Sequence, residues 1–422
     1  MKKKNRIRIG VIADDFTGAS DAASFLVKHG ADTMLFTGIP DSMKETADCV
    51  VIALKSRSVS PREAIRQVKE AADFLKKTGT DCIYFKYCST FDSTPQGNIG
   101  IALDFLLDEL QLPYTLLCPS LPVNGRTVKD GILYVYGTPL DESPMKNHPL
   151  NPMWDSHIAK LMRPQSRYPC FTIGRELFKI DQIKKVIDDY QRKYDKFYLI
   201  PDYETIQDGY KIAELFKTLP LLSGGSGLLE YLAPVKSAAN QTRKAEQSKR
   251  CILLCGSCSA MSKKQIAAYR QSGGITYPVD SKKLLHHTLS AEEIFQYVQQ
   301  ASSPVLVYSA AVEQDIRELA CAATFRQESK LIEACMADLS VMARDSGFDC
   351  IITAGGETSG AVTLRLGYHS YHIQDVIAPG VPELIPAEHP DMKLILKSGN
   401  FGDESFFMKA LGKEKLYGTA AE

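Results

Sequence analysis

The sequence predicts an α/β protein of two domains, each with a largely parallel sheet flanked by helices. Short apolar runs of strand length alternate with helical stretches in both halves of the 422 residues, a pattern typical of parallel sheets. At roughly 150 residues per domain, the length suggests two or three domains. A polar segment separates the halves, because residues 236–250 contain five basic residues, one acid and no Leu, Ile, Val or Phe. We therefore expect an N-terminal domain over residues 1–235, a linker over 236–250 and a C-terminal domain over 251–422.

In the first half, apolar runs predict strands and periodic or capped stretches predict helices. Ser60, Pro61 and Glu63 form the pattern of a capping box, which opens a helix that runs to about residue 77. The expected strands cover residues 7–13, 33–36, 50–54, 82–85, 114–118 and 197–200, and further helices end near residue 28 or cover 101–110 and 210–219. Residues 119–164 are rich in proline and break the pattern, so we expect a long irregular segment there.

The second half repeats the alternation. A strand over residues 251–255 leads through a turn into a helix over residues 262–270, and later strands lead into glycine-containing loops and helices in the same way. The expected later strands cover residues 304–308, 350–353 and 392–397.

Composition excludes several classes of protein. Fifty Lys and Arg balance fifty Asp and Glu, so no global basic field favours a nucleic-acid partner. No run approaches the roughly 18 consecutive apolar residues of a membrane span. Eleven cysteines, an odd number spread along the chain, fit a reducing compartment better than a disulfide framework. These features predict a cytoplasmic protein without a membrane or nucleic-acid partner.

In an open parallel sheet, ligands bind beyond the carboxyl ends of the strands. Asp14 and Asp15 follow the first expected strand, where carboxylates can bind a hydroxylated substrate or act as a base; helix capping is the alternative. Lys86 ends another strand and can hold an anionic group. Arg126 and His148 come from the irregular segment, and an Arg suits a carboxylate. As a set, these residues indicate a small polar anionic substrate.

Loops of Gly and Ser or Thr follow strands of the second half, at residues 256–259, 355–360 and 398–402. Glycines let backbone N–H groups approach a phosphate, and the following helix contributes its positive N-terminus. Tight strand-to-helix turns are the alternative explanation. Three such loops in one domain favour a nucleotide.

Other nucleotide-binding motifs are absent from the sequence, and the possible metal-binding patterns do not place enough ligands close together. The chain has no G-x-x-x-x-G-K-[ST] run and no G-x-G-x-x-G after a strand. Cys251, Cys255 and Cys258 have the spacing of iron–sulfur ligands, but a strand would place the first two about 13 Å apart. His369 and His372 lie in a stretch that does not read as a helix and have no evident third ligand. We therefore assign no metal-ligating residue.

Long strings at these positions resemble the four-carbon acid sugar kinases, over almost the whole chain. The strings are Val11–Ala19 (VIADDFTGA), Lys86–Thr94 (KYCSTFDST) and Ala354–Gly360 (AGGETSG). Further strings are most similar to the 3-oxo-tetronate kinases of that family: Pro122–Val128, Met145–Leu150, Ile377–Pro382 and Leu396–Gly402.

The resemblance implies an N-terminal domain that binds a sugar acid, a C-terminal domain that binds ATP, and an active site in the cleft between them. The implied reaction is phosphorylation of the C4 hydroxyl of a four-carbon acid, with Mg²⁺ as the metal and Asp14 or Asp15 as the base. Expected substrate-binding residues are Thr17, Lys86, Ser89, Asp92, Ser93, Arg126, His148, Ser223, Gly224 and Ser226. Expected nucleotide-binding residues are Ser257, Ser259, Gly355, Gly356, Glu357, Thr358, Ser359, Gly360, Gly399, Asn400 and Gly402.

Alternatives remain open at this point. D-Threonate, D-erythronate or L-threonate would serve the same chemistry as 3-oxo-tetronate. An NAD-dependent sugar-acid dehydrogenase would need a dinucleotide fingerprint, which the sequence lacks. A ligand sensor that binds without turnover is a third alternative. The sequence does not fix the assembly, for which a homodimer is one alternative, nor does it show which carboxylate is the base.

Overall fold

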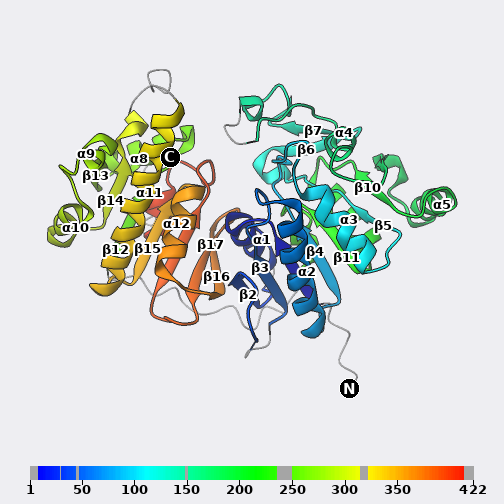
Figure 1. Ribbon diagram of the computed structural model, residues 1–422, viewed down its shortest axis with the longest axis horizontal. Coiled ribbons are helices and arrows are strands. Elements are labelled where there is room, and N and C mark those ends of the chain that lie inside the picture. Colours follow the sequence, from blue (N-terminus) through cyan, green and yellow to red (C-terminus); the bar gives the residue numbers. More distant parts are fainter. Residues whose placement is uncertain are drawn as a thin grey trace, which may run out of the picture. The chain divides into compact units, whose positions relative to one another are not determined.

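The computed structural model describes residues 8–28, 30–43, 47–147, 151–234, 250–313 and 322–412 (Figure 1). The chain divides into two compact units, residues 1–241 and 242–422, and each has the predicted α/β architecture. The predicted linker over residues 236–250 lies outside the described residues except for Arg250.

Parallel strands form the main sheet of unit 1, in the order β11-β4-β1-β3-β2. Their bounds are β1 Ile9–Ala13, β2 Thr33–Thr37, β3 Cys49–Ala53, β4 Cys82–Lys86 and β11 Leu221–Gly224. Every residue of β1, β3 and β4 is buried, as the continuous apolar runs predict for strands covered on both faces. Because the strands are parallel, their carboxyl ends lie at one edge of the sheet.

Helices pack against this sheet, with α1 in contact with β1, β2, β3 and β4 and α2 beside α3. The helices of unit 1 are α1 Phe16–Val27, α2 Pro61–Lys77, α3 Ile99–Glu109, α4 Ile158–Met162, α5 Ile180–Gln191, α6 Ile206–Phe216 and α7 Leu229–Leu232. At the start of α2, Ser60 accepts the N–H of Glu63, as predicted. The Glu63 carboxylate pairs with Arg66 rather than returning to Ser60, so only half of the capping box forms.

Two smaller sheets complete unit 1. A parallel sheet has the order β5-β10-β9, and an antiparallel one has the order β6-β7-β8. Their bounds are β5 Tyr114–Leu116, β6 Arg126–Lys129, β7 Ile132–Val135, β8 Thr138–Pro139, β9 Cys170–Ile173 and β10 Phe197–Pro201. The prediction of an irregular segment over residues 119–164 is therefore wrong where β6, β7, β8 and α4 form. Asp130 and Gly131 both have positive φ, 53° and 72°, and make the two-residue hairpin turn between β6 and β7.

In unit 2, parallel strands have the order β18-β15-β12-β14-β13, and β17 and β16 continue the sheet beyond β18 in antiparallel fashion. Their bounds are β12 Cys251–Cys255, β13 Ile275–Val279, β14 Val305–Ser309, β15 Cys350–Ala354, β16 Ser370–Ala378, β17 Val381–Pro386 and β18 Lys393–Lys397. Cys251 and Cys255 occupy opposite ends of β12, as the predicted strand over residues 251–255 implies.

The helices of unit 2 are α8 Ala260–Gln271, α9 Ser281–Leu285, α10 Ala291–Gln300, α11 Ala322–Asp345, α12 Gly356–Leu366 and α13 Phe406–Ala410. In Figure 1, α11 and α12 lie side by side, in agreement with their contacts. Among the described helices, none combines the length and apolar character needed to cross a bilayer.

Gln165 ties the segment after α4 to the start of α3. Its Oε1 accepts the N–H of Ile99 at 3.1 Å and the hydroxyl of Ser93 at 3.1 Å. Asn98, which precedes α3, makes no cap with its side chain, so Gln165 takes the place of a local cap. Gln165 is buried, so these donors would have no easy access to water without it.

Gln165→Ala should lower the free energy of unfolding by about 1–3 kcal/mol, because buried donors lose their acceptor. Urea denaturation followed by circular dichroism measures the change. Gln191→Ala, at the exposed end of α5, is the control and should stay within about 0.5 kcal/mol of the wild type. Equal small effects of the two substitutions would contradict the capping role.

Candidate active site

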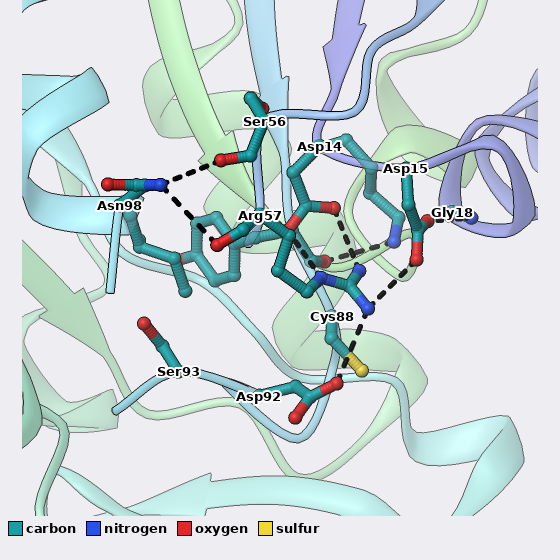
Figure 2. A network of polar contacts seen from close by, with 12 residues as sticks. Asp14, Asp15, Gly18, Ser56, Arg57, Cys88, Asp92, Ser93 and Asn98 are labelled. Atoms are coloured by element: carbon teal, nitrogen blue, oxygen red, sulfur yellow. Dashed lines mark hydrogen bonds and ion pairs between the residues drawn. The ribbon is translucent and has the colours of Figure 1, made fainter. Parts of the chain in front are cut away.

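Polar side chains gather where β1, β3 and β4 end in unit 1 (Figure 2). Asp14 and Asp15 follow β1, Arg57 follows β3 in the loop that leads to α2, and Asp92 follows β4. Parallel pairing puts these strand ends side by side, so residues far apart in the sequence meet.

Arg57 is the centre of this cluster. Its Nε and Nη2 each donate to one oxygen of Asp14 at 2.8 Å, a bidentate pair. Its Nη1 lies 2.8 Å from Asp15 Oδ2 and 3.3 Å from Asp92 Oδ2. One guanidinium thus holds carboxylates from two loops in fixed orientations.

Burial shapes the charges of this cluster. Burial of Arg57 works against its charged form, but the carboxylates of Asp14 and Asp15 raise the pKa of the guanidinium well above its usual value. Burial also raises the pKa of Asp14, although Arg57 acts in the opposite direction. A carboxylate with a raised pKa is a better proton acceptor, which is what a general base requires.

Asp15 has two functions at once. Its Oδ1 accepts the N–H of Gly18 at 2.5 Å, so it is the N-cap of α1, and its Oδ2 faces Arg57. The capping alternative considered for this residue therefore holds together with the ion pair. The Asp15 side chain is 33% exposed, against 5% for Asp14, so Asp15 is the more accessible carboxylate.

Asn98 holds the loop that carries Arg57. Its Nδ2 donates to the carbonyl oxygen of Ser56 at 2.8 Å (Figure 2) and to that of Val59 at 2.9 Å. These bonds bracket Arg57 in the sequence. The start of α3 and the loop after β3 are thus joined at the point where the guanidinium must be placed.

Lys86 lies beneath α1 and is only 2% exposed. Its Nζ donates to the carbonyl oxygen of Tyr87 at 2.9 Å and lies 3.5 Å from Asp21 Oδ2. Asp21 also accepts the hydroxyl of Ser226, and burial raises the pKa of Asp21 against the opposing effect of Lys86. The Lys86 ammonium thus neutralises a buried carboxylate rather than facing open space.

The other expected substrate-binding residues lie in several different elements of unit 1, and some of them are fully buried. Ser223 and Ser226 are fully buried, and Ser223 donates to the carbonyl of Leu116 at 2.5 Å. Ser93 donates to Gln165. Thr17 lies at the start of α1 beside the cluster, and Ser89 and Gly224 lie in the loop after β4 and at the end of β11. His148 lies outside the described residues.

Arg126 belongs to the separate β6–β8 sheet. Its guanidinium lies 5.3 Å from the ring centroid of Tyr136, and Nη1 donates to the carbonyl of Asn124. Its Nε is buried and has no hydrogen-bond partner in the described part of the chain. No hydrogen bond or ion pair joins it to the Arg57 cluster within the described residues.

In unit 2, the predicted glycine loops meet. The N–H of Ser257 donates to the carbonyl of Ala354 at 3.2 Å, and that of Gly355 to the carbonyl of Lys397 at 2.9 Å. A methyl group added to Gly399 would lie 2.6 Å from Ser257 Oγ, so the loops after β12 and β18 approach closely enough that a larger residue would displace this hydroxyl. Ser259 caps α8 by accepting the N–H of Ser262.

A cavity of about 240 Å³ opens at these loops. Its walls include residues 256–258 and 355–358, and the N-terminus of α12 lies among them. Free N–H groups at a helix N-terminus favour an anion. Of the remaining expected nucleotide residues, Ser359 is buried and bonded to Thr353, and Gly360, Asn400 and Gly402 do not line the cavity.

Sequence reasoning missed two sets of residues. Arg57 carries no recognisable motif, and its one signal was its place four residues after a buried strand. The cavity also has a wall from helices and other loops: Ser281, Ser309, Ala311, Glu328, Ser329, Ile332 and Glu333. Burial, together with the charge of Glu357, raises the pKa of Glu333. Among the described residues that line this cavity there is no lysine or arginine.

Within the described residues, His, Cys, Asp and Glu side chains form no group of three or more suited to a metal ion.

Comparisons with known proteins match a separate family model to each of the two units. A family model described as a sugar-binding N-terminal domain matches residues 9–232, and one described as a nucleotide-binding C-terminal domain matches residues 252–407. A Salmonella typhimurium LT2 protein named 3-oxo-tetronate kinase is 40% identical over 416 residues, 96% of this chain and 98% of that protein. A Haemophilus influenzae protein of the same name is 38% identical over 412 residues, 96% of this chain and 99% of that protein.

Among solved structures, that of a Salmonella typhimurium LT2 protein described as a tRNA synthase has 40% identity and a TM-score of 0.81. The match covers 96% of this chain and 99% of that one. These matches confirm the resemblance noted in the sequence. The chain belongs to the four-carbon acid sugar kinase family, in which a sugar-binding N-terminal domain precedes a nucleotide-binding C-terminal domain.

Proposed function

We propose that this chain is an ATP-dependent kinase that phosphorylates the C4 hydroxyl of a four-carbon sugar acid, with 3-oxo-tetronate as the substrate. Relatives that match nearly the whole chain carry the name 3-oxo-tetronate kinase. The structural observation that supports the proposal is the contrast between the units. Unit 1 gathers charged side chains around Arg57, and unit 2 gathers glycine loops around a cavity.

Phosphoryl transfer needs alignment and charge neutralisation more than covalent help. The loops after β12 and β15 and the N-terminus of α12 supply backbone N–H groups for the phosphates. Because no lysine or arginine is among the described residues that line the cavity, a cation bound with the nucleotide would supply positive charge there. The donor set fits Mg²⁺, which needs only one or two carboxylates besides phosphates and water; Glu328, Glu333 and Glu357 line the cavity. When bound, Mg²⁺ would neutralise charge on the β- and γ-phosphates.

In unit 1, carboxylates of the cluster would accept hydrogen bonds from the substrate hydroxyls. Arg57 keeps Asp14 and Asp15 oriented, and one of the two takes the proton of the C4 hydroxyl. Arg126, whose buried Nε lacks a partner among the described residues, is suited to the substrate carboxylate. Lys86 would act indirectly, by neutralising the buried carboxylate of Asp21 in α1.

The experiment that tests this function is ADP release with Mg-ATP over a panel of acids. The panel holds 3-oxo-tetronate (both C2 epimers), D-threonate, D-erythronate and L-threonate. We expect turnover confined to an oxo acid. Turnover of a threonate or erythronate instead would support the kinase activity but contradict 3-oxo-tetronate as the substrate. No ADP release with any acid would contradict the kinase proposal.

Arg57→Met should lower kcat about 100-fold, because the carboxylates lose charge-assisted hydrogen bonds worth about 1.5–3 kcal/mol each. Arg57→Lys should recover part of the loss, because it keeps the charge without the bidentate fork. The KM for ATP should stay within about twofold. Arg66→Met, on the exposed face of α2, is the matched control. A kcat within threefold of the wild type in folded Arg57→Met would refute the role.

Substitution of the base should lower kcat by about 10²- to 10⁴-fold, the usual contribution of a general base. Asp14→Asn and Asp15→Asn, assayed separately, distinguish the two candidates. If Asp14 is the base, its raised pKa means that activity falls on acidification at a higher pH than for an ordinary carboxyl group, since the protonated form cannot accept a proton. Near-normal turnover in both variants would exclude these residues as the base.

A further inference from the structure

Lys397, the last residue of β18, has a buried ammonium group beside the nucleotide loops. The residue is 0% exposed. Its Nζ donates to the carbonyl oxygens of Ser398 at 3.0 Å and Gly399 at 2.7 Å, and it lies 5.6 Å from the ring centroid of Phe406. In the described part of the chain, no carboxylate pairs with it. Because a buried charge is costly unless its donors are bonded, the loop carbonyls and the ring must compensate it.

These bonds fix the direction of two peptide groups. In a planar trans peptide, the carbonyl of one residue and the N–H of the next point in opposite directions. Since Lys397 holds the carbonyls of Ser398 and Gly399, the N–H groups of Gly399 and Asn400 point away from it. Neither N–H donates a hydrogen bond within the described residues. The loop therefore presents two oriented donors for an anion.

Lys397 also joins this loop to its neighbours. Its backbone carbonyl accepts the N–H of Gly355, in the loop that opens α12. The carbonyl of Gly399, which Lys397 binds, also accepts the hydroxyl of Ser262 on α8 at 3.1 Å. Lys397 thus contacts, directly or through the Gly399 carbonyl, elements that carry the three predicted glycine loops, after β12, β15 and β18.

We propose that Lys397 is a positioning residue for nucleotide binding: its ammonium turns the carbonyls of Ser398 and Gly399 inward, so that the N–H groups of Gly399 and Asn400, beside the cavity-lining Ser257 rather than in the cavity wall itself, are left for a phosphate that reaches beyond the cavity. This inference rests on the proposed ATP-dependent function. The ammonium itself is occupied by the loop and need not touch the nucleotide. Removal of the ammonium should therefore weaken the binding of ATP without weakening the binding of the sugar acid.

The protonation of this lysine gives an independent readout. Burial lowers the pKa of Lys397 to about 8, against an opposing effect of Cys255 on β12. Burial raises the pKa of the Cys255 thiol to about 11, so Cys255 stays protonated while Lys397 titrates. Phe406 of α13 carries no charge. Below pH 8 the charged group holds both carbonyls; above it the neutral amine holds them less well, and nucleotide affinity should fall.

The test compares Lys397→Met, which removes the ammonium at similar volume, with Lys393→Met at the opposite end of β18. Lys393 pairs with buried Glu383 at 3.0 Å, so its loss disturbs the same strand away from the loops. Titration calorimetry with ADP and steady-state kinetics are measured at pH 7.0 and 9.0, with thermal unfolding as the folding control.

In Lys397→Met, we expect the ADP dissociation constant and the KM for ATP to rise tenfold or more, with the KM for the sugar acid within twofold. The wild type should lose ADP affinity between pH 7 and 9, and Lys397→Met should lack that change. Lys393→Met should lower the melting temperature without changing the affinity for ADP.

Unchanged ADP affinity in folded Lys397→Met would overturn this inference but not the proposed function. If that variant does not fold, a pH-independent ADP affinity in the wild type would overturn it. No ADP binding by the wild type would overturn the proposed function as well.

Discussion

Parallel strand pairing is the constraint on which both candidate sites depend. In each unit, it brings the carboxyl ends of neighbouring strands to one edge, so short loops from distant parts of the sequence meet there. In unit 1 this edge joins Asp14, Arg57 and Asp92. In unit 2 it joins Ser257, Gly355 and Gly399. The same pairing rule, applied to different loop residues, produces two different kinds of site.

The two edges handle charge in opposite ways. Unit 1 concentrates carboxylates and compensates them with Arg57 and Lys86, both largely buried. Unit 2 offers backbone N–H groups, and its buried cation, Lys397, is bonded to the loop. A carboxylate cluster suits a substrate with several hydroxyl groups, whereas oriented N–H groups suit phosphates. This difference agrees with the descriptions of the two family domains as sugar-binding and nucleotide-binding.

Much of this arrangement could be predicted from the sequence, because buried strands appear as continuous apolar runs and their following loops hold unusual residues. The strands before Asp14 and before Gly355 are clear examples. Arg57 could not be predicted, since a lone arginine in a loop has no local pattern and its role arises only from its partners across the sheet. Glu333 was missed because it lies inside a helix, where no strand-end rule applies. The β6–β7 hairpin was overlooked although Asp130-Gly131 is a typical hairpin turn; the surrounding prolines masked it.

The central claim is that the γ-phosphoryl group of ATP passes to the terminal hydroxyl of the acid. Proton-coupled phosphorus NMR of the reaction mixture tests it most directly, because C4 is a methylene carbon. We expect a new phosphomonoester signal, split into a triplet by the two C4 protons, to grow with ADP. A doublet would place the phosphate on a secondary hydroxyl, and inorganic phosphate as the only new signal would show hydrolysis without transfer; either result would contradict the account.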